Sequence, residues 1–559
     1  MDARIPPVLR PDHPPVRRLS ALAARFADRV VGDPSGIQVT GITLATADLR
    51  AGEVFVAVAG VHRHGAEFAR AAQDAGAVAV VTDPAGAELA AGAGVRVPVL
   101  VVDDPRALLG AMSAWVYGTG TSGAADEAGT VAAGAVAASA ANGGDEHELG
   151  PMPRLLATTG TNGKTSVSHL LEGILQQVGA VTGLSSTAER HIGDQVVVSR
   201  LTTPEASEMH ALLALMRERG VEAIAVEVSA QALSRHRVDG IVFDVAGFTN
   251  LSHDHLDDYA DMREYFEAKA PLFQPERARR GVVSLDTDSG HAIAAGAGIP
   301  IVTVGTPAIA RDAAAAAAAD WVVTIGAELP AYTEFTLTGP GARALTTRVP
   351  VIGPHMAANA SLAIVMMLEA GYAWDDIVSA LARDGGIRAY LPGRTERVSG
   401  DTGPTVFVDF GHSPDAFEKT LAAVRRVTPG RVLMLFGADG DRDASKRLDM
   451  GRTAVLGSDI LVVTDHHPRF EDPASIRRTL IEGARAARPD AEIHEYSPPE
   501  AAIVAAVGLV GEGDAILWAG PGHQDYRDIR GVRTPYSARE LARAALRDAG
   551  WAVPEARQR

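Results

Sequence analysis

One segment of the chain limits the fold more than any other: residues 154–175, with the sequence RLLATTGTNGKTSVSHLLEGIL. Its apolar start is typical of a buried strand, its middle is a glycine-rich turn, and Lys164 and Thr165 open an amphipathic helical pattern. Strand, turn and helix in this order are typical of a mostly parallel sheet covered by helices. We therefore predict an α/β fold with a phosphate site where the turn meets the helix.

The turn itself is the candidate phosphate site. Its backbone N–H groups are expected to cradle phosphates, Lys164 to neutralise them, and the Thr165 hydroxyl to coordinate magnesium. The strict pattern of such loops is missed by one position, because Thr158 stands where the first glycine belongs. The alternative is a glycine-rich turn without a ligand. The predicted nucleotide-binding residues here are Gly160, Thr161, Asn162, Gly163, Lys164, Thr165 and Ser166.

The length of 559 residues exceeds what one hydrophobic core supports, and strand–helix alternation marks three units. Residues 1–117 are expected to form a small α/β domain. Residues 118–150 are small, glycine-rich and aromatic-free, and are predicted to be a flexible linker. Alternation resumes over 151–391 and again over 392–559, where four apolar runs predict a mostly parallel sheet. An alanine run at 310–320 either interrupts this alternation or forms a surface helix.

Composition narrows the class of protein. Hydrophobic residues make up 47% and charged residues 22%, the ordinary balance of a globular protein. The net charge of −17 opposes binding to nucleic acid or to an anionic membrane, so any phosphate site must be local. The chain has no cysteine, which excludes disulfides and thiolate metal sites. The start of the chain lacks an apolar signal core, and we expect a cytoplasmic protein that acts as a monomer.

Further polar residues follow predicted strands downstream. Glu227 lies in AVEVSAQAL, and Asn250, Asp254 and His255 lie in FTNLSHDHLDDY. Strand ends that meet at one crevice would bring this carboxylate and imidazole together, and both groups are suitable cation ligands. Taken alone, each would be read as a surface residue or a satisfied core residue.

The segment TGTNGKTS resembles the phosphate loop of the Mur ligases, and the resemblance continues in order through nearly the whole chain apart from the predicted linker. It implies a three-domain architecture with a UDP-binding N-terminal domain, a central ATPase-type sheet and a Rossmann-like third domain. It also implies that Glu227 and His255 hold a magnesium ion. Lys269, in YFEAKAPLF, occupies the position of a carbamylated lysine that helps to hold magnesium, a modification that turns a cation into an anion.

The resemblance extends to nucleotide contacts outside the loop. It implies that Arg394 in LPGRTERV reaches the nucleotide phosphates, that Asp409 in FVDFGHSPDAFE holds the ribose, and that Asn359 lies near the base. His412 follows Asp409. A charge cluster in FGADGDRDASKRLDMG also matches the family; its members are Asp441, Arg442, Asp443, Lys446 and Arg447.

Four segments resemble the branch of the family that adds the third amino acid to the muramyl peptide. They are the segment around Thr46, TTPE at 202–205, TDHHPRFEDP at 464–473, and AGPGHQDYRDIRGVRTPYSARELA. The substrate-binding residues that the resemblance implies are Thr46, Thr202, Thr203, Ser229, Arg237, His466, His467, Arg469, Gly520 and Gln524.

The chain departs from the family pattern at several positions. Met356 replaces an asparagine expected near the base, and Gln231 replaces a histidine. Three changes fall near the incoming amino acid: His466 and His467 for an Asp–Asn pair, Pro521 for a lysine, and Gln524 for a glutamate.

These departures bear on which amino acid is added. Relatives that take meso-diaminopimelate pair its distal carboxylate with the arginine at Arg469 and its distal ammonium with the glutamate that is Gln524 here. Only the arginine is retained, so we expect diaminobutyrate, ornithine or homoserine to be better substrates than meso-diaminopimelate or lysine. The alternative is that these substitutions are ordinary sequence drift, and that other residues compensate for their effect on specificity.

The resemblance therefore implies an ATP-dependent ligase that adds the third amino acid to UDP-N-acetylmuramoyl-dipeptide in peptidoglycan precursor synthesis. ATP and Mg²⁺ would activate the dipeptide carboxylate as an acyl phosphate, and the amine of a free amino acid would attack it. Two alternatives are a related ligase such as folylpolyglutamate synthase, and a scaffold paralogue without catalysis. The apparent UDP-binding domain disfavours the first, and the intact Lys164, Glu227, His255 and Lys269 disfavour the second.

Deleting residues 120–148 should change activity and melting temperature little, because a segment of this composition has few contacts to lose. Activity and thermal melting of the deletion variant check this. Loss of soluble protein would show that the segment is structural.

Overall fold

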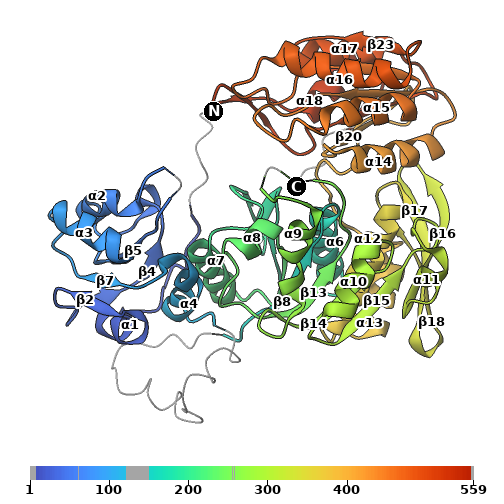
Figure 1. Cartoon of the computed structure of the whole chain (residues 1–559). Helices are drawn as coiled ribbons and strands as arrows, with labels where there is room; N and C mark the ends of the chain where they lie inside the picture. Colours follow the sequence, from blue (N-terminus) through green and yellow to red (C-terminus); the bar gives the residue numbers. More distant parts are fainter. Residues whose placement is uncertain (1–7, 61, 121–149, 255, 257, 555–559) are drawn as a thin grey trace.

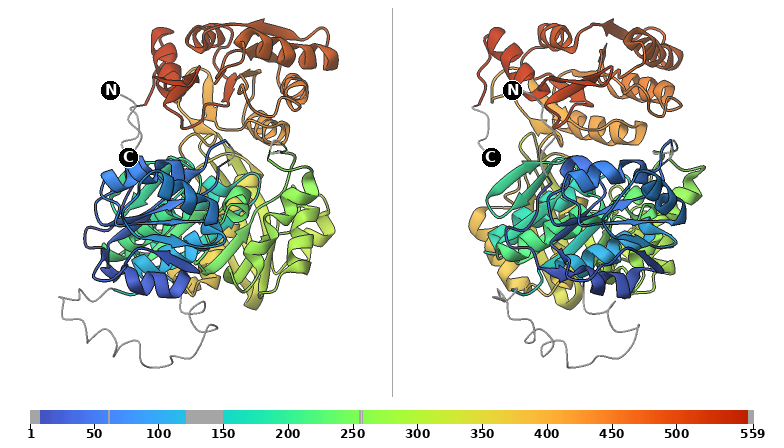
Figure 2. Two further views of the ribbon diagram at one scale, coloured as in Figure 1. Left: turned by 60° about the vertical axis from the view of Figure 1, so that its left-hand side comes forward. Right: turned by 90° about the vertical axis from the view of Figure 1, so that its left-hand side faces the viewer.

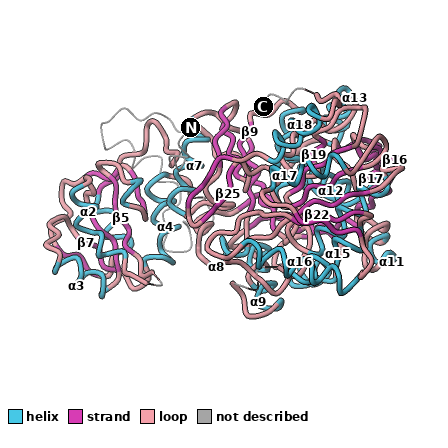
Figure 3. The backbone as a smooth tube through the Cα atoms, turned by 90° about the horizontal axis from the view of Figure 1, so that it is seen from above, coloured by secondary structure: helices cyan, strands magenta, loops and turns pink. Residues whose placement is uncertain are grey.

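The computed structural model describes residues 8–60, 62–120, 150–254, 256 and 258–554. It contains three helix-covered sheets, with the C-terminal unit above the central one and the N-terminal unit at its side (Figures 1 and 2). Seen from above, the N-terminal unit stands apart at one side (Figure 3). Most of the predicted linker, and His255, lie outside the described residues.

The N-terminal sheet has the strand order β2-β7-β6-β5-β4 and is parallel except at β2. Its helix α4 begins at Pro105, where the Asp104 side chain caps two backbone N–H groups, and ends before Gly118 in the left-handed conformation. The core of this unit continues onto α7 of the central unit. The elements are β2 (Arg29–Val31), β4 (Gly41–Thr43), β5 (Glu53–Ala57), β6 (Ala79–Thr82), β7 (Val99–Val101), α1 (Leu19–Phe26), α2 (Ala69–Asp74), α3 (Pro84–Gly92), α4 (Pro105–Tyr117), a small β1 (Arg17–Arg18) and β3 (Gln38–Val39) pair, and the 3-10 helices η1 (Thr46–Asp48) and η2 (Gly65–Phe68).

The central sheet has eleven strands in the order β11-β10-β9-β12-β8-β13-β14-β15-β16-β17-β18. It is parallel from β9 to β16 and antiparallel at both edges. The strands are β8 (Arg154–Thr159), β9 (Thr182–Ser185), β10 (Glu189–Ile192), β11 (Gln195–Val198), β12 (Ala223–Glu227), β13 (Phe243–Phe248), β14 (Ala278–Ser284), β15 (Ile301–Gly305), β16 (Trp321–Leu329), β17 (Tyr332–Gly339) and β18 (Arg343–Val349).

Helices cover both faces of this sheet. Along β8, Leu155 packs into one core and Leu156 into the other, as the period of two in a strand requires. The alanine run at 310–320 forms the short helix α11. The helices are α6 (Lys164–Gln177), α7 (Ala206–Glu218), α8 (Ala230–Ser234), α9 (Met262–Glu267), α10 (Asp288–Gly296), α11 (Ala313–Ala317), α12 (Pro354–Glu369) and α13 (Trp374–Asp384), with the 3-10 helices η3 (Ala270–Phe273) and η4 (Pro340–Ala342).

The C-terminal sheet has the order β19-β20-β24-β21-β22-β23 and is parallel except at β19. The four predicted strands are its four central ones. The elements are β19 (Glu396–Arg397), β20 (Thr405–Asp409), β21 (Val432–Phe436), β22 (Ile460–Val463), β23 (Glu492–Glu495), β24 (Ala515–Ala519), a separate hairpin β25 (Tyr526–Ile529) and β26 (Val532–Pro535), and helices α14 (Pro414–Arg426), α15 (Arg447–Gly457), α16 (Pro473–Ala487), α17 (Pro499–Gly508) and α18 (Ala538–Asp548).

Strand order positions the candidate site. Strand β8 lies between β12 and β13, and all three run parallel. Glu227 at the end of β12 is paired with Thr158, and Phe248 at the end of β13 is paired with Thr159. Because parallel strands end at one edge, the phosphate loop, Glu227 and the Asn250 segment meet there, as the sequence predicted.

Helix α6 carries the phosphate loop, and its packing should be sensitive to loss of volume. Leu171→Ala should lower the free energy of unfolding by about 2–5 kcal/mol, because this side chain is fully buried in the central core. Leu329→Ala is the matched control, since Leu329 is 46% exposed, and it should cost less than about 1 kcal/mol. Denaturant unfolding followed by fluorescence checks both values. Equal losses in the two variants would contradict the assigned core.

Candidate active site

A cavity of about 1080 Å³ lies between the central and C-terminal units. Its walls contain most of the residues that the sequence singled out. Those that line it are Thr161, Asn162, Gly163, Lys164, Thr165, Ser166, Thr202, Glu227, Ser229, Arg237, Lys269, Asn359, Arg394, Asp409, His466, His467, Arg469, Gly520 and Gln524.

Three predicted residues that the structure describes do not line this cavity. Gly160 begins the loop, where its carbonyl accepts from Lys164 and Lys269, and Thr46 begins η1 in the N-terminal unit. Thr203 is fully buried, donates to the Glu227 carbonyl at 2.8 Å and accepts the Ser229 N–H at 3.2 Å. Thr203 therefore fixes the strand end beside the cavity and does not face it.

The loop conformation requires glycine at two positions. Gly160 has a φ of 146°, and a Cβ there would lie 1.9 Å from the Thr249 hydroxyl. Gly163 has a φ of 93°, and a Cβ there would lie 2.8 Å from the Asn359 side chain. Gly163 also caps α6, so the free N–H groups of the helix start face the cavity.

Two lysines, buried Lys269 and half-buried Lys164, lie side by side at the loop. Lys164 Nζ donates to the carbonyls of Gly160 at 3.1 Å and Thr161 at 2.9 Å. Lys269 Nζ donates to the same Gly160 carbonyl at 3.0 Å and lies 4.4 Å from the centre of the Tyr265 ring. Burial lowers the pKa of Lys164, and burial together with the charge of Lys164 holds the pKa of Lys269 well below its ordinary value.

Lysine is rare in this chain. Only four of the 52 basic residues are lysines, and Lys164, Lys269, Lys419 and Lys446 all line this cavity. Lys419 was not singled out from the sequence, although the scarcity of lysine would have pointed to it. Arginine carries positive charge elsewhere, so the protein places its compact, titratable cations at one site.

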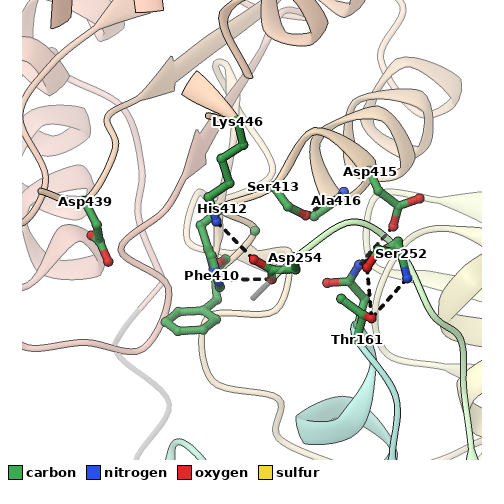
Figure 4. A network of polar contacts seen from close by, with 12 residues as sticks. Thr161, Ser252, Asp254, Phe410, His412, Ser413, Asp415, Ala416, Asp439 and Lys446 are labelled. Atoms are coloured by element: carbon green, nitrogen blue, oxygen red, sulfur yellow. Dashed lines mark hydrogen bonds and ion pairs between the residues drawn. The ribbon is translucent and has the colours of Figure 1, made fainter. Parts of the chain in front are cut away.

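Two buried carboxylates face these lysines. Glu227 accepts the Thr187 N–H and the Thr187 hydroxyl, each at 2.9 Å. Asp254, 6% exposed, accepts from Lys446 at 3.2 Å, and His412 Nε2 lies 3.9 Å from its other oxygen (Figure 4). Both carboxylates offset the burial of Lys164 by their charge. Carboxylates and the Thr165 hydroxyl form an oxygen-rich donor set of the kind that Mg²⁺ prefers.

The C-terminal unit contacts the loop directly. Asn162 donates to Asp415 at 2.9 Å, and Asp415 is labelled in Figure 4. Arg394 donates to the Thr165 hydroxyl at 2.7 Å and stacks on Phe410. The order of the loop is thus coupled to the position of the C-terminal unit.

The Asp409 carboxylate is hydrogen-bonded to nearby residues of the C-terminal unit. It accepts the Thr395 N–H at 2.7 Å, the Thr395 hydroxyl at 3.2 Å and the Gly411 N–H at 2.6 Å. These bonds fix the turn that presents Arg394. The ribose contact inferred from the sequence stays a prediction.

Residues facing the N-terminal side are also tied into the fold. The Thr202 hydroxyl lies 3.0 Å from the Thr187 hydroxyl, and the Ser229 hydroxyl caps α8. Buried Arg237 pairs with Glu205 at 3.0 Å.

The wall formed by the C-terminal unit is built on two adjacent imidazoles. His466 Nδ1 lies 2.7 Å from an Asp439 oxygen, and His467 Nε2 lies 2.8 Å from Gln524 Oε1. Burial, then the charge of His466, lowers the pKa of His467 to about 4, so its ring is neutral near pH 7. Sequence reasoning missed Asp439, which lies shortly after the end of strand β21 at the carboxyl edge of a parallel sheet; that position alone does not indicate its pairing with His466.

Three family profiles match the chain: "Mur ligase family, catalytic domain" over residues 38–117, "Mur ligase middle domain" over 158–367, and "Mur ligase, glutamate ligase domain" over 393–522. A protein named UDP-N-acetylmuramyl-tripeptide synthetase from Leifsonia xyli subsp. xyli is 54% identical, covering 99% of this chain and 100% of its own length. A protein named UDP-N-acetylmuramoyl-L-alanyl-D-glutamate--2,6-diaminopimelate ligase from Streptomyces coelicolor is 40% identical, covering 95% and 98%.

A solved structure of a UDP-N-acetylmuramoyl-L-alanyl-D-glutamate--2,6-diaminopimelate ligase shares the fold, with a TM-score of 0.62 and 23% identity over 96% of this chain and all of that one. The chain belongs to the Mur ligase family. It is accordingly an ATP-dependent ligase that forms an amide bond, and members of this family generally use ATP and Mg²⁺. Within the described residues, no helix combines the length and apolar character needed to cross a membrane.

Lys164→Ala should abolish turnover while leaving the melting temperature nearly unchanged, because it removes a charge that faces phosphate and not a core contact. Arg311→Ala is a control that removes a positive charge from an exposed ion pair with Asp288. Steady-state ATP turnover and thermal melting check both variants. A near-normal rate in Lys164→Ala would contradict the nucleotide site.

Proposed function

We propose that this chain adds the third amino acid to UDP-N-acetylmuramoyl-dipeptide, with ATP as the activating substrate. The observation that carries the proposal is one cavity in which a phosphate loop, lysines and carboxylates face a polar wall of the C-terminal unit. Support comes from the full-length similarity to a protein named as a tripeptide synthetase.

In the proposed reaction, a terminal carboxylate oxygen of the dipeptide attacks the γ-phosphorus of ATP, and the bond to the β-phosphate oxygen breaks to release ADP. The amine of the incoming amino acid then attacks the acyl carbon and loses a proton. The tetrahedral intermediate collapses and expels phosphate. Lys164 and the start of α6 would hold the phosphates, and the protein would act mainly by positioning two anions and screening their repulsion.

Magnesium would be held by Thr165, Glu227 and carbamylated Lys269, with His255 as a further predicted ligand. When bound, it would neutralise charge on the transferred phosphoryl group. The described donors fit this ion: Glu227 is fully buried at the loop, and the Thr165 hydroxyl lines the same cavity. An unmodified lysine could not ligate a cation as an ammonium group.

The surroundings of Lys269 favour carbamylation. The residue is 1% exposed, and this burial lowers the pKa of its amine, which favours the neutral form that reacts with carbon dioxide. The product carries a negative charge next to Lys164, which attracts the ammonium group that a charged Lys269 would repel. The modification thus relieves an electrostatic cost that the fold imposes.

A ¹³C carbamate resonance should appear after incubation with labelled bicarbonate and be absent in Lys269→Ala. The assignment is direct because the chain has only four lysines. Lys269→Ala should lose activity and recover part of it with small carboxylic acids. Lys419→Ala is the matched control and should retain the resonance. If the wild type showed no carbamate signal and Lys269→Ala were fully active, the modification would be refuted.

The UDP end of the substrate is proposed to lie toward residues 1–117, with 151–391 as the ATP-binding domain and 392–559 as the amino-acid-binding domain. Arg200 lines the cavity and pairs with Asp48 at 2.8 Å, which brings the 3-10 helix that begins at Thr46 to the cavity edge. Thr46 is therefore a suitable contact for the UDP moiety. We also propose a cytoplasmic, monomeric enzyme.

Phosphate release with UDP-muramyl dipeptide, ATP and a pool of amino acids tests the function. Release that depends on both the dipeptide and an amino acid is expected, with a product heavier by one residue. Release with a folate substrate and glutamate instead would favour the folylpolyglutamate synthase alternative. No release with any substrate would favour the scaffold alternative.

A further inference from the structure

The reaction has three substrates, and the proposed function assigns two parts of the cavity. ATP lies on the phosphate loop, and the UDP-dipeptide approaches from the side of Arg200 and Thr202. The remaining wall belongs to the C-terminal unit and contains Asp439, His466 and Gln524. By elimination, this wall receives the incoming amino acid.

Asp439 and His466 form a hydrogen-bonded pair in this wall. Burial alone would raise the pKa of Asp439, but the hydrogen bond and charge of His466 hold the pKa well below its ordinary value. Asp439 is thus ionised. Its second oxygen lies 3.5 Å from Arg469, too far for a strong bond, and retains acceptor capacity.

His466 offers a second polar atom at the cavity. Its Nδ1 faces the ionised Asp439 and donates to it. Its Nε2 is buried and has no hydrogen-bond partner among the described residues, and the residue lines the cavity. A buried polar nitrogen without a partner is costly unless a ligand forms a hydrogen bond with it.

The neighbouring groups are donors. The Asp528 backbone N–H donates to His467 Nδ1 at 2.9 Å, so the neutral ring must donate from Nε2 to Gln524 Oε1. The free N–H groups of the Gln524 amide can then donate, as can those of Arg469. These donors suit the carboxylate that every amino acid carries.

The same tautomer argues against a metal centre here. Ligand atoms of Asp439, His466 and His467 lie within 4.8 Å of one another. However, the Asp528 N–H occupies Nδ1 of His467, and the proton on Nε2 is committed to Gln524. Neutral His467 has no lone pair free, so only two candidate ligands remain, fewer than a typical site needs.

We propose that Asp439, held by His466, binds the side-chain ammonium of the incoming amino acid and selects a diamino acid over its uncharged isostere. This rests on the proposed function and deepens it. Although position 524 carries glutamine where related enzymes carry glutamate, the wall still contains an anion, because Asp439 provides one.

The test compares 2,4-diaminobutyrate with homoserine, which differ by an ammonium and a hydroxyl at the end of chains of equal length. The wild type should favour diaminobutyrate by about tenfold or more in kcat/KM. Asp439→Asn should lower kcat/KM for diaminobutyrate by about 10–100-fold and for homoserine by less than about threefold. His466→Asn should reduce the preference in the same direction.

Asp525→Asn is the matched control, since Asp525 lines the same cavity but pairs with Arg539 at 2.9 Å. It should keep the wild-type ratio of the two substrates. The inference would be overturned if both Asp439→Asn and His466→Asn kept the preference for diaminobutyrate over homoserine. It would also be overturned if the wild type showed no such preference. Melting temperatures exclude misfolding as the cause of a loss.

A second readout separates this inference from the proposed function. Hydroxylamine traps an acyl phosphate as a hydroxamate and needs ATP and the UDP-dipeptide but no amino acid. If the wild type forms the hydroxamate but the variants keep the wild-type ratio of kcat/KM for diaminobutyrate and homoserine, only the Asp439 assignment is wrong. No hydroxamate from the wild type with UDP-muramyl dipeptide would defeat the proposed function itself.

Discussion

The site depends on two adjacent lysines at one glycine-rich loop, of which Lys269 is buried and Lys164 is half-buried. Lys164 and Lys269 share the Gly160 carbonyl as an acceptor. Two adjacent cations with little access to water are costly, and nearby anions offset that cost. Glu227 and Asp254 supply part of the compensation from neighbouring strand ends, and nucleotide phosphates and a carbamate would supply the rest. The fold is therefore arranged to bind phosphate before any catalytic step occurs.

The use of lysine follows from the same constraint. An arginine is always charged, whereas a lysine can lose its proton when it is desolvated. The chain carries its surface charge on arginine and keeps its four lysines for this cavity. Lys446 and Asn162 extend the arrangement across the gap between units, because each pairs with a carboxylate of the other unit. Binding at the loop is thus linked to the position of the C-terminal unit.

The local features of the site could be predicted from sequence because short segments encode them. The strand–turn–helix unit at 154–175 and the four central strands of the C-terminal sheet were confirmed, since apolar runs and glycines mark them directly. Asp439 could not be found in this way, because its function depends on His466, which is distant in the chain and adjacent only in the fold. The inward position of Thr203 likewise depends on long-range packing. The placement of Thr46 depends on contacts between units, and His255 remains a prediction.

The proposed mechanism requires that the dipeptide carboxylate become an acyl phosphate in this cavity. UDP-muramyl dipeptide labelled with ¹⁸O in its terminal carboxylate tests this most directly, with mass analysis of the phosphate released during one turnover. The account predicts one ¹⁸O atom in each inorganic phosphate, because the oxygen that attacks the γ-phosphorus leaves with it. Phosphate free of ¹⁸O, released together with the amide product, would contradict the mechanism and the assignment of the cavity.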